Sequence, residues 1–177
     1  MIRFFDISFS LVGLVLLFPL LTFIWFLGLL DNGSPLYIQK RVGHNLKIFL
    51  LIKFRTMPIN TKSTATHLMK NVKFTVFGYF LRKTKLDEIP QLFNVLMGNM
   101  SFVGPRPCLL NQRKLIYERK KRGVFKVKPG ITGLAQISDI NMKTPTLLSK
   151  TDQKMIKEMS LFLYFQIIFR TIFLTIR

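Results

Sequence analysis

An unbroken apolar segment near the amino end constrains this chain more than any other feature. Residues 7–30 contain no charged side chain. As an α-helix, these residues would extend roughly 36 Å at about 1.5 Å per residue, which is enough to cross the hydrocarbon core of a bilayer. The segment exceeds the apolar stretch of about 7 to 15 residues in a cleavable signal peptide, and no small-residue cleavage site follows it. We therefore expect residues 1–30 to remain on the protein as a membrane anchor.

Pro19 lies in the middle of this segment, where it removes one backbone hydrogen bond and predicts a kink or a break. Two topologies remain open: the helix crosses the membrane, or it turns at Pro19 and leaves by the face it entered. The chain has 27 Lys and Arg against 8 Asp and Glu, and only Arg3 and Asp6 of these lie in the first thirty residues. The excess of positive charge on the remainder predicts a cytoplasmic location under either topology.

Residues 31–177 are expected to form one cytosolic domain of the α+β class, mainly helical with a small β-hairpin. Turn-forming residues at 31–35 end the anchor. The hairpin strands are predicted at 36–39 and 48–54, and the polar residues 57–73 should form a surface loop. Helices are predicted at 74–82, 88–97, 109–122 and 151–176.

Two of these helices have a pattern that suits either a protein core or a lipid surface. The helix at 109–122 ends in a run of basic residues, and the one at 151–176 carries phenylalanines at helical spacing. Both are predicted to be amphipathic helices of the membrane interface, with packing against the core as the alternative.

The net charge of +19 calls for acidic partners: nucleic acid, anionic lipid or phosphorylated substrates. The sequence has no zinc-finger spacing, RNA-binding aromatic motif or leucine zipper, so a nucleic-acid partner is not expected. The apolar anchor favours an anionic phospholipid membrane. One cysteine and two histidines exclude an intrachain disulfide and argue against an imidazole-bound metal, so a divalent ion would need oxygen ligands.

Asp87 and Glu88 are the only adjacent acidic residues in the chain. Pro90 suits the first turn of a helix and Gly98 its end, so both carboxylates should lie near a helix N-terminus. The helix dipole there should keep Asp87 ionised, as a nucleophile requires, and Glu88 could hold Mg²⁺. The alternative is a helix cap, in which Thr84 and Asp87 form a weak capping box.

Basic residues surround this pair. Arg82, Lys83 and Lys85 flank it, and residues 104–107 read Gly-Pro-Arg-Pro, a rigid turn that presents Arg106. The guanidinium group of arginine suits a phosphate. Neither a Walker loop nor a G-x-G-x-x-G motif is present, so phosphates would be bound by arginines, a helix end and a carboxylate-held cation.

These motifs together resemble the bacterial sugar transferase family, the small monotopic phosphoglycosyl transferases. The resemblance runs from about residue 3 to about residue 175. It rests on the anchor, on the segment at 37–57, on LRKTKLDEIPQLFNVLMGNMSFVGPRP at 81–107 and on KPGITGLAQ at 128–136.

The resemblance implies transfer of a sugar 1-phosphate from a UDP-sugar to polyprenol (undecaprenyl) phosphate, with release of UMP. In this family the residues at the positions of Asp87 and Glu88 are the nucleophile and a Mg²⁺ ligand, and those of Pro105, Arg106 and Pro107 lie at the uridine end of the donor. It further implies a re-entrant helix broken at Pro19, on the cytoplasmic face of the bacterial inner membrane. The reaction would be the first membrane step of O-antigen, capsule or glycoconjugate synthesis.

Further candidates have less support. Arg82, Lys53, Arg55 and Lys128 are predicted phosphate contacts, each with a solvated surface position as the alternative. Asp152 falls near an acid that recurs in the family and is carried as a candidate substrate-binding residue, with a structural role as the alternative. Residues 138–141 replace an Asn-Gly-Arg-Asn type run of many relatives, and Lys128 stands where an arginine is frequent, so the donor sugar is left open.

Two other classes of function are also compatible with the sequence. One is a non-enzymatic, membrane-anchored basic interaction protein in which the acidic pair merely caps a helix. The other is a membrane-tethered nucleic-acid binder, which would need salt-sensitive affinity for DNA or RNA. The sequence leaves a homo-oligomeric state open.

Overall fold

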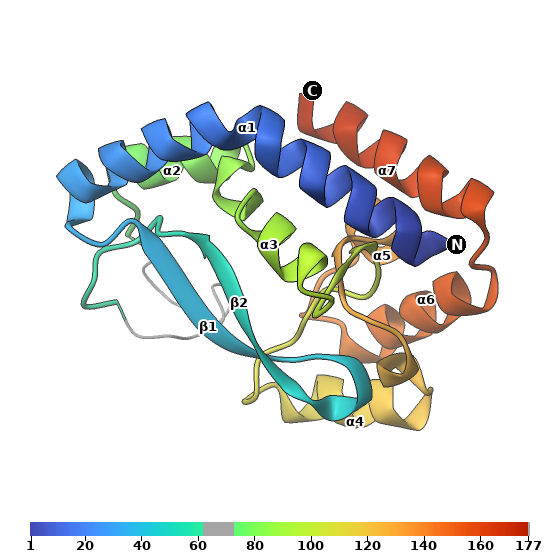
Figure 1. Ribbon diagram of the computed structural model, residues 1–177. Helices are drawn as coiled ribbons and strands as arrows, with labels where there is room; N and C mark the ends of the chain where they lie inside the picture. The colour runs from blue at the N-terminus through green and yellow to red at the C-terminus, as the bar shows by residue number, and fades with distance from the viewer. Residues whose placement is uncertain (62–72, 177) are drawn as a thin grey trace.

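The computed structural model describes residues 1–61 and 73–176. Three apolar helices form one side of the molecule: α1 (Ile2–Asn32), α2 (Val76–Lys83) and α7 (Leu161–Ile176). The β-hairpin lies below them, and α4 (Arg113–Lys121) lies at the opposite end (Figure 1). The predicted α+β class is confirmed, because helices predominate over two small sheets.

Helix α1 continues through Pro19, so the predicted break is not found. The helix arches along its length (Figure 1) and ends at Gly33, whose φ of 69° provides a left-handed cap. The loss of one backbone hydrogen bond at Pro19 bends a helix without ending it when the flanking turns keep theirs and the helix packs against a neighbour, here α3 (Gln91–Leu96). By length and composition α1 could cross a bilayer; the re-entrant topology remains a prediction.

The two charged residues of the anchor fasten it to the rest of the protein. The buried carboxylate of Asp6 accepts hydrogen bonds from the Ser101 hydroxyl at 2.9 Å, the Phe102 backbone N–H at 3.0 Å and the Tyr164 hydroxyl at 2.9 Å. Arg3 donates to two carbonyl groups near the end of α3, at 2.6 and 2.8 Å. These charges therefore satisfy internal polar groups, and α1 is an integral part of the fold.

The predicted hairpin is confirmed. Strands β1 (Leu36–Val42) and β2 (Ile48–Phe54) pair in antiparallel fashion. The side chain of Asn94 on α3 extends this sheet, since its amide donates to the Leu50 carbonyl at 2.7 Å and accepts from the Ile52 N–H at 3.0 Å. Because Asn94 is fully buried, these two bonds satisfy its polar atoms and fix α3 against β2.

A second, two-stranded sheet was not predicted. Strand β3 (Ser101–Val103) pairs in parallel with β4 (Gly130–Thr132), within the glycine- and proline-rich segment 126–136. Gly104 and Gly130 cross with their backbones in direct contact, because a Cβ atom on Gly130 would lie 2.1 Å from the Gly104 nitrogen. Only glycine permits this close approach, which brings the segments 104–107 and 128–136 together.

The remaining predicted elements are partly confirmed. The helices expected at 74–82, 88–97 and 109–122 correspond to α2, α3 and α4, which are shorter. The single helix expected at 151–176 is two: α6 (Pro145–Lys157) and α7, divided where the Ser160 hydroxyl accepts a hydrogen bond from the Leu163 N–H at 3.2 Å. A short helix, α5 (Leu134–Ile137), precedes them. Most of the loop expected at 57–73 lies outside the described residues.

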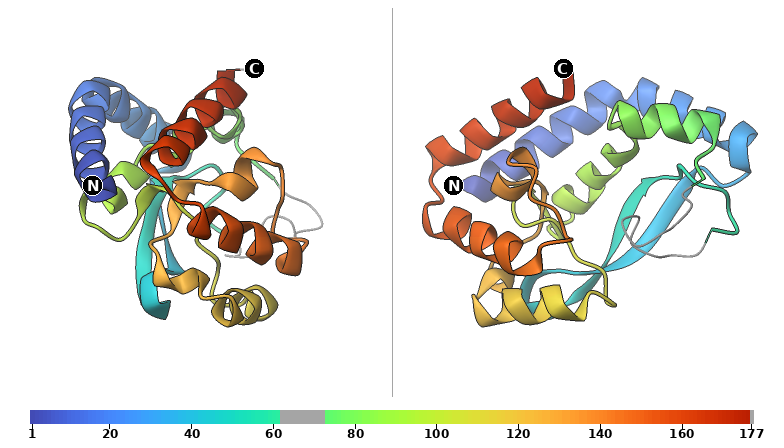
Figure 2. Two further views of the ribbon diagram at one scale, coloured as in Figure 1. Left: turned by 90° about the vertical axis from the view of Figure 1, so that its right-hand side faces the viewer. Right: turned by 180° about the vertical axis from the view of Figure 1, so that it is seen from behind.

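Large apolar side chains are exposed along α1, α2 and α7, which share one side of the molecule in both rotated views (Figure 2). They include Phe18, Val76, Tyr79, Phe162 and Phe173, each more than 60% exposed. We call these three helices the apolar layer. An apolar surface of this extent fits membrane association. The basic helix α4 lies at the far end and does not contribute to the layer, unlike α7.

Candidate active site

The acidic pair lies in a tight turn directly before α3. Asp87 and Glu88 belong to a 3₁₀ turn, Leu86–Glu88, and Pro90 is the residue that caps α3. Lys85 enters the turn with a φ of 61°, a left-handed conformation that a non-glycine residue adopts at some energetic cost. Asp87 is only 4% exposed. The sequence thus placed the pair correctly near a helix start, although the helix begins three residues later than predicted.

Burial governs the ionisation of Asp87. Desolvation raises the pKa of its carboxyl group above the ordinary value, and the neighbouring Glu88 carboxylate raises it further. Lys53, Arg82 and Arg106 oppose this rise through their positive charges. Burial thus opposes the ionised form that the start of the helix was expected to favour, and nearby cations stabilise that form.

Glu88 is bound to Arg106. The guanidinium Nη2 atom lies 2.6 Å from the Glu88 carboxylate. Burial alone would raise the pKa of Glu88, but the charge and the hydrogen bond of Arg106 more than offset this and hold the pKa below its ordinary value. The Arg106 side chain is 48% exposed and that of Glu88 19%, so both groups remain accessible to a ligand.

The backbone that presents Arg106 is fixed at three successive carbonyl groups. The Pro105 carbonyl accepts from the Gly130 N–H at 3.0 Å, that of Arg106 from Arg119 at 2.7 Å and that of Pro107 from Arg41 at 3.1 Å. Both prolines are buried while the side chain of Arg106 is exposed. The predicted rigid turn is confirmed, and the structure adds the partners that make it rigid.

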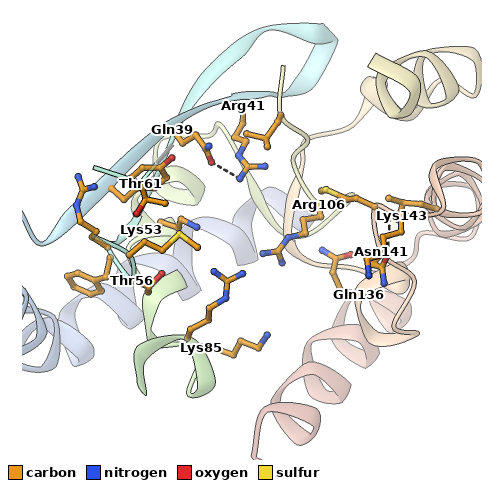
Figure 3. A pocket seen from close by; sticks show the side chains of 18 of the residues that line it. Gln39, Arg41, Lys53, Thr56, Thr61, Lys85, Arg106, Gln136, Asn141 and Lys143 are labelled. Atoms are coloured by element: carbon orange, nitrogen blue, oxygen red, sulfur yellow. Dashed lines mark hydrogen bonds between the residues drawn. The ribbon is translucent and has the colours of Figure 1, made fainter. Parts of the chain in front are cut away.

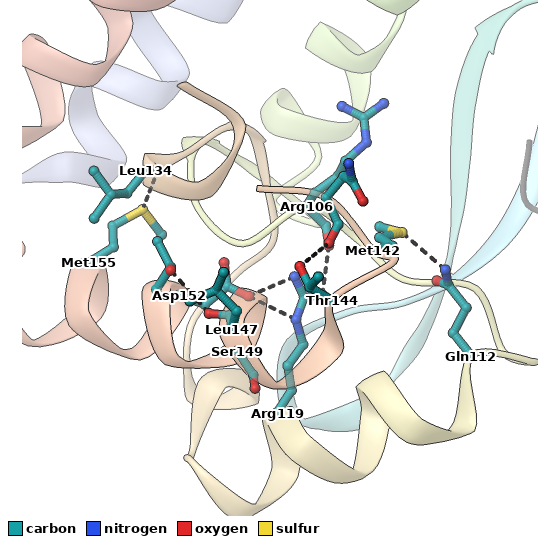
Figure 4. Close-up of polar contacts among 12 residues, drawn as sticks. Arg106, Gln112, Arg119, Leu134, Met142, Thr144, Leu147, Ser149, Asp152 and Met155 are labelled. Atoms are coloured by element: carbon teal, nitrogen blue, oxygen red, sulfur yellow. Dashed lines mark hydrogen bonds and ion pairs between the residues drawn. The ribbon is translucent and has the colours of Figure 1, made fainter. Parts of the chain in front are cut away.

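Asp152 supports this turn indirectly. Its carboxylate forms a buried ion pair with Arg119, with distances of 2.9 Å to Nε and 2.8 Å to Nη2 (Figure 4). The remaining Nη1 group of Arg119 donates to the Arg106 carbonyl. Asp152 is fully buried, so the structure favours its structural alternative over direct contact with a substrate.

A cationic cavity of about 470 Å³ opens beside Arg106. Lysine and arginine side chains from β1, β2, the 82–85 segment and the 104–107 turn converge on it (Figure 3). Among the described residues the only carboxylate in its lining is Asp139, and its basic residues are Arg41, Lys53, Arg55, Arg82, Lys85, Arg106 and Lys143. A cavity lined in this way suits a ligand with several negative charges, such as a diphosphate.

Two of these cations, Lys53 and Arg41, bind their protons less tightly than usual, chiefly because they are buried. Burial lowers the pKa of Lys53 to about 8, although the Asp87 charge partly offsets this. Burial and the charge of Arg106 lower the pKa of Arg41 to about 10. An anion bound beside them would stabilise their charged forms.

Two predicted phosphate contacts are placed differently from the rest. The Arg55 guanidinium lines the cavity but also donates to the backbone carbonyls of Ser34 and Leu36, at 2.9 and 3.2 Å, and so fixes the start of β1. Lys128 does not line the cavity among the described residues; it lies beside Gly98, and burial and the charge of Arg3 lower its pKa.

The sequence did not single out several residues that line the cavity. Tyr37, Gln39 and Arg41 are every second residue of β1, and they lie on the face that also carries Lys53. Because alternate residues of a strand share one face, this spacing could have identified Gln39 and Arg41 from the sequence. The segment that departs from the family pattern, 138–141, also contributes to the lining, which is consistent with its expected link to the donor sugar.

The carboxylates present fit a magnesium ion that is shared with a substrate. No group of three or more His, Cys, Asp or Glu side chains that could hold a metal ion occurs within the described ranges. Mg²⁺ commonly uses one or two carboxylates, several waters and substrate phosphates. The negative charges of Asp87 and Glu88 repel each other, which contributes to the raised pKa of Asp87. A magnesium ion bound beside them would offset this repulsion.

Comparison with known proteins agrees with this geometry. The family model described as bacterial sugar transferase matches residues 1–177. An undecaprenyl-phosphate galactose phosphotransferase of Salmonella typhimurium is 36% identical over 78% of this chain and 33% of its own length. A UDP-glucose:undecaprenyl-phosphate glucose-1-phosphate transferase of Klebsiella pneumoniae is 38% identical over 95% of this chain and 38% of its own.

A relative of more similar length is the exopolysaccharide production protein ExoY of Sinorhizobium fredii, which is 36% identical over 96% of this chain and 83% of its own length. The chain thus spans about a third of the Salmonella and Klebsiella relatives and most of the Sinorhizobium one. With the acidic pair, the fixed Gly-Pro-Arg-Pro turn and a family match over its whole length, the chain belongs to the bacterial sugar transferases.

Proposed function

We propose that this protein transfers a sugar 1-phosphate from a UDP-sugar to polyprenol phosphate, releases UMP, and forms a covalent intermediate on Asp87. The observation that carries the proposal is a buried aspartate, Asp87, that interacts with the charges of Lys53, Arg82 and Arg106, three residues that line the cationic cavity. Asp87 does not line the cavity itself, and its turn contacts α2 of the apolar layer. The relatives' names support undecaprenyl phosphate as the acceptor and hexose phosphates as the group transferred. The reaction would be the first membrane step of polysaccharide or glycoconjugate synthesis.

The cationic cavity would hold the donor. Its lysines and arginines match the two negative phosphates of a nucleoside diphosphate sugar. Arg106 is exposed enough to exchange part of its contact with Glu88 for a phosphate oxygen. Residues 139–143 form part of the wall of the cavity and are candidates for contact with the sugar or the base.

The chemistry would proceed in two displacements. An Asp87 carboxylate oxygen forms a bond to the sugar-bearing phosphorus, and the bond from that phosphorus to the bridging oxygen breaks, so UMP leaves with the electron pair. A phosphate oxygen of polyprenol phosphate then attacks the same phosphorus, and the Asp87 carboxylate leaves unchanged. The two anionic substrates never have to meet each other directly, which is the advantage of a covalent route.

Glu88, together with Asp87, would hold Mg²⁺ with the donor phosphates. When bound, this ion would neutralise part of the negative charge on the phosphoryl oxygens. Arg106 and Lys53 would stabilise charge on the same oxygens, and their positions would be preserved by the fixed 104–107 turn and by β2.

The apolar layer would set the catalytic residues at the membrane surface. In this proposal α1 dips into the cytoplasmic face of the bacterial inner membrane as a re-entrant helix, and α2 and α7 contact anionic phospholipids. The acceptor phosphate, which stays in the headgroup region, would then reach Asp87 without leaving the membrane.

The experiment is a measurement of UMP release by the protein in nanodiscs with Mg²⁺, polyprenol phosphate and a panel of UDP-sugars. Wild-type protein should release UMP from at least one donor, and mass spectrometry with donor alone should find the phosphosugar on residue 87. Asp87→Asn should reduce release to background. Asp31→Asn, at the exposed end of α1, serves as the matched control and should retain activity. UMP release that is unaffected by Asp87→Asn would overturn the proposal, whereas intact lipid binding without UMP from any donor would favour a non-enzymatic role.

A further inference from the structure

A second cavity, of about 440 Å³, has a different character from the first. We call it the apolar groove. It is bounded by α1 and α7, the blue and red helices that diverge in the left view of Figure 2, and by α3, β3, β4 and α5. Its apolar lining consists of Leu17, Ile89, Leu92, Phe102, Ile131, Ile137 and Leu174.

One end of the groove is polar and joins the cationic cavity. Lys85, Arg106 and Gln136 line both cavities, and Glu88 lines the groove. The side-chain amide atoms of Gln136 are buried and find no hydrogen-bond partner among the described residues. A buried amide without a partner is costly, so a ligand that bonds to it at this junction would gain affinity.

The other end of the groove lies within the apolar layer. Leu17 belongs to α1 and Leu174 to α7, and the adjacent Phe18 and Phe173 are 66% and 73% exposed. A chain that leaves the groove there would meet the exposed apolar side chains of α1 and α7. The ligand that fits is therefore amphiphilic, with an anionic head at Arg106 and a long apolar tail directed toward α1 and α7.

We propose that the apolar groove holds the first isoprene units of the polyprenol phosphate and aligns its phosphate with Asp87. This inference rests on the proposed function, because the acceptor is defined there. The tail is already dissolved in lipid before it binds, so entering the groove gains little hydrophobic free energy. The groove would therefore act by orienting the acceptor, and filling it should impair the second displacement while leaving the first intact.

The test fills the groove with a larger side chain. Leu17→Trp and Leu174→Trp should each lower kcat/KM for polyprenol phosphate by about tenfold or more. The burst of UMP with donor alone should stay at the wild-type amplitude, which also shows that each variant is folded. Leu16→Trp is the matched control: Leu16 precedes Leu17 on α1, is 72% exposed and does not line the groove, so both half-reactions should be unchanged. Equal acceptor kinetics in Leu17→Trp, Leu174→Trp and wild type would overturn the inference.

A binding measurement separates this inference from the proposed function. A polyprenyl phosphate that carries a diazirine on its first isoprene units should crosslink to peptides of α1 and α7 that contain Leu17 and Leu174. Unlabelled polyprenyl phosphate should compete, and phosphatidylglycerol at the same concentration should not. Crosslinking elsewhere, or equal competition by phosphatidylglycerol, would overturn the groove assignment even if UMP release and its dependence on Asp87 are intact. Specific crosslinking without UMP release from any donor would leave the lipid site standing and count against the proposed reaction.

Discussion

Two arginine–carboxylate pairs act on the same turn in opposite ways. Arg119 and Asp152 are both at most 2% exposed, and Arg119 donates to the backbone carbonyl of Arg106. Arg106 and Glu88 are 48% and 19% exposed, and their contact involves the side chain of Arg106. The buried pair fixes the backbone, while the accessible pair leaves the guanidinium available to a ligand. An arginine–carboxylate pair therefore supports the turn when it is buried, and it forms part of the candidate site when it is accessible.

The energies of the two pairs should differ accordingly. Removing one partner of a buried pair leaves an uncompensated charge in the interior, whereas a pair in contact with water loses little because solvent replaces the partner. If the distinction is correct, substitutions at Asp152 should act on stability, and those at Glu88 on activity.

The largest effect on stability is expected for Asp152→Ala. This change leaves the Arg119 guanidinium buried without its carboxylate, and we expect the free energy of unfolding to fall by about 3–5 kcal/mol. Denaturant titration followed by circular dichroism measures it. Glu118→Gln is the control, because Glu118 of α4 and the capping residue Arg122 form an i,i+4 pair that is still in contact with solvent, at 17% and 16% exposure, and its loss should cost less than about 1 kcal/mol. Similar losses of stability in the two variants would contradict the distinction between the buried pair and a solvent-accessible one.

Glu88→Gln should show the reverse pattern. The unfolding free energy should change by less than about 1 kcal/mol. Donor kcat/KM should fall by on the order of 10²-fold, since Arg106 loses its orienting carboxylate and the proposed Mg²⁺ site loses a negative charge. UMP release and denaturant titration on the same preparation compare the two. A stability loss as large as that of Asp152→Ala would mean that this pair is structural as well.

The smallest expected effect is a pH dependence of donor kcat/KM. It tests the charge of Lys53, a cavity residue that belongs to neither arginine–carboxylate pair. Burial lowers the pKa of Lys53 to about 8, so its positive charge is present below that pH and is lost as the pH rises through it. Donor kcat/KM, which reports the free enzyme, should therefore decline by up to about tenfold per pH unit above this value. Lys53→Arg should remove the decline, because arginine stays charged.

Lys40→Arg provides the control for this profile, since Lys40 is an exposed residue of β1 that does not line the cavity. Its profile should match that of the wild type. A wild-type profile without a decline between pH 7.5 and about 9.5 would show that the charge of Lys53 does not contribute to donor binding.

Local patterns in the sequence predicted much of the fold. The alternation of residues in the hairpin and the capping and stop residues of the helices act within a few positions, so β1, β2, α2 and α4 were found near their predicted places. The pairing of β3 with β4 was missed, because it depends on Gly104 meeting Gly130 from far along the chain. No local periodicity marks such a contact.

The candidate site divides in the same way. Asp87, Glu88 and Arg106 were recognisable from residue type and spacing, and the structure brings the last two into contact. The partners of Asp6 and Asp152 were not recognisable, since Ser101 and Arg119 lie 95 and 33 positions away; a structural role for Asp152 was only one of two alternatives. The sequence alone does not distinguish a buried carboxylate from an exposed one, because its hydrogen-bond donors come from distant parts of the chain.

The sequence by itself determined that this protein has an apolar anchor, a basic remainder, an adjacent pair of carboxylates and a turn that presents an arginine. Residue chemistry and short-range geometry are sufficient for these features. Only the tertiary structure decided that α1 continues through Pro19, that Asp152 supports the turn from the interior, and that a cationic cavity and an apolar groove meet at Arg106. These features depend on which distant side chains share a buried space, and burial is a property of the packed chain.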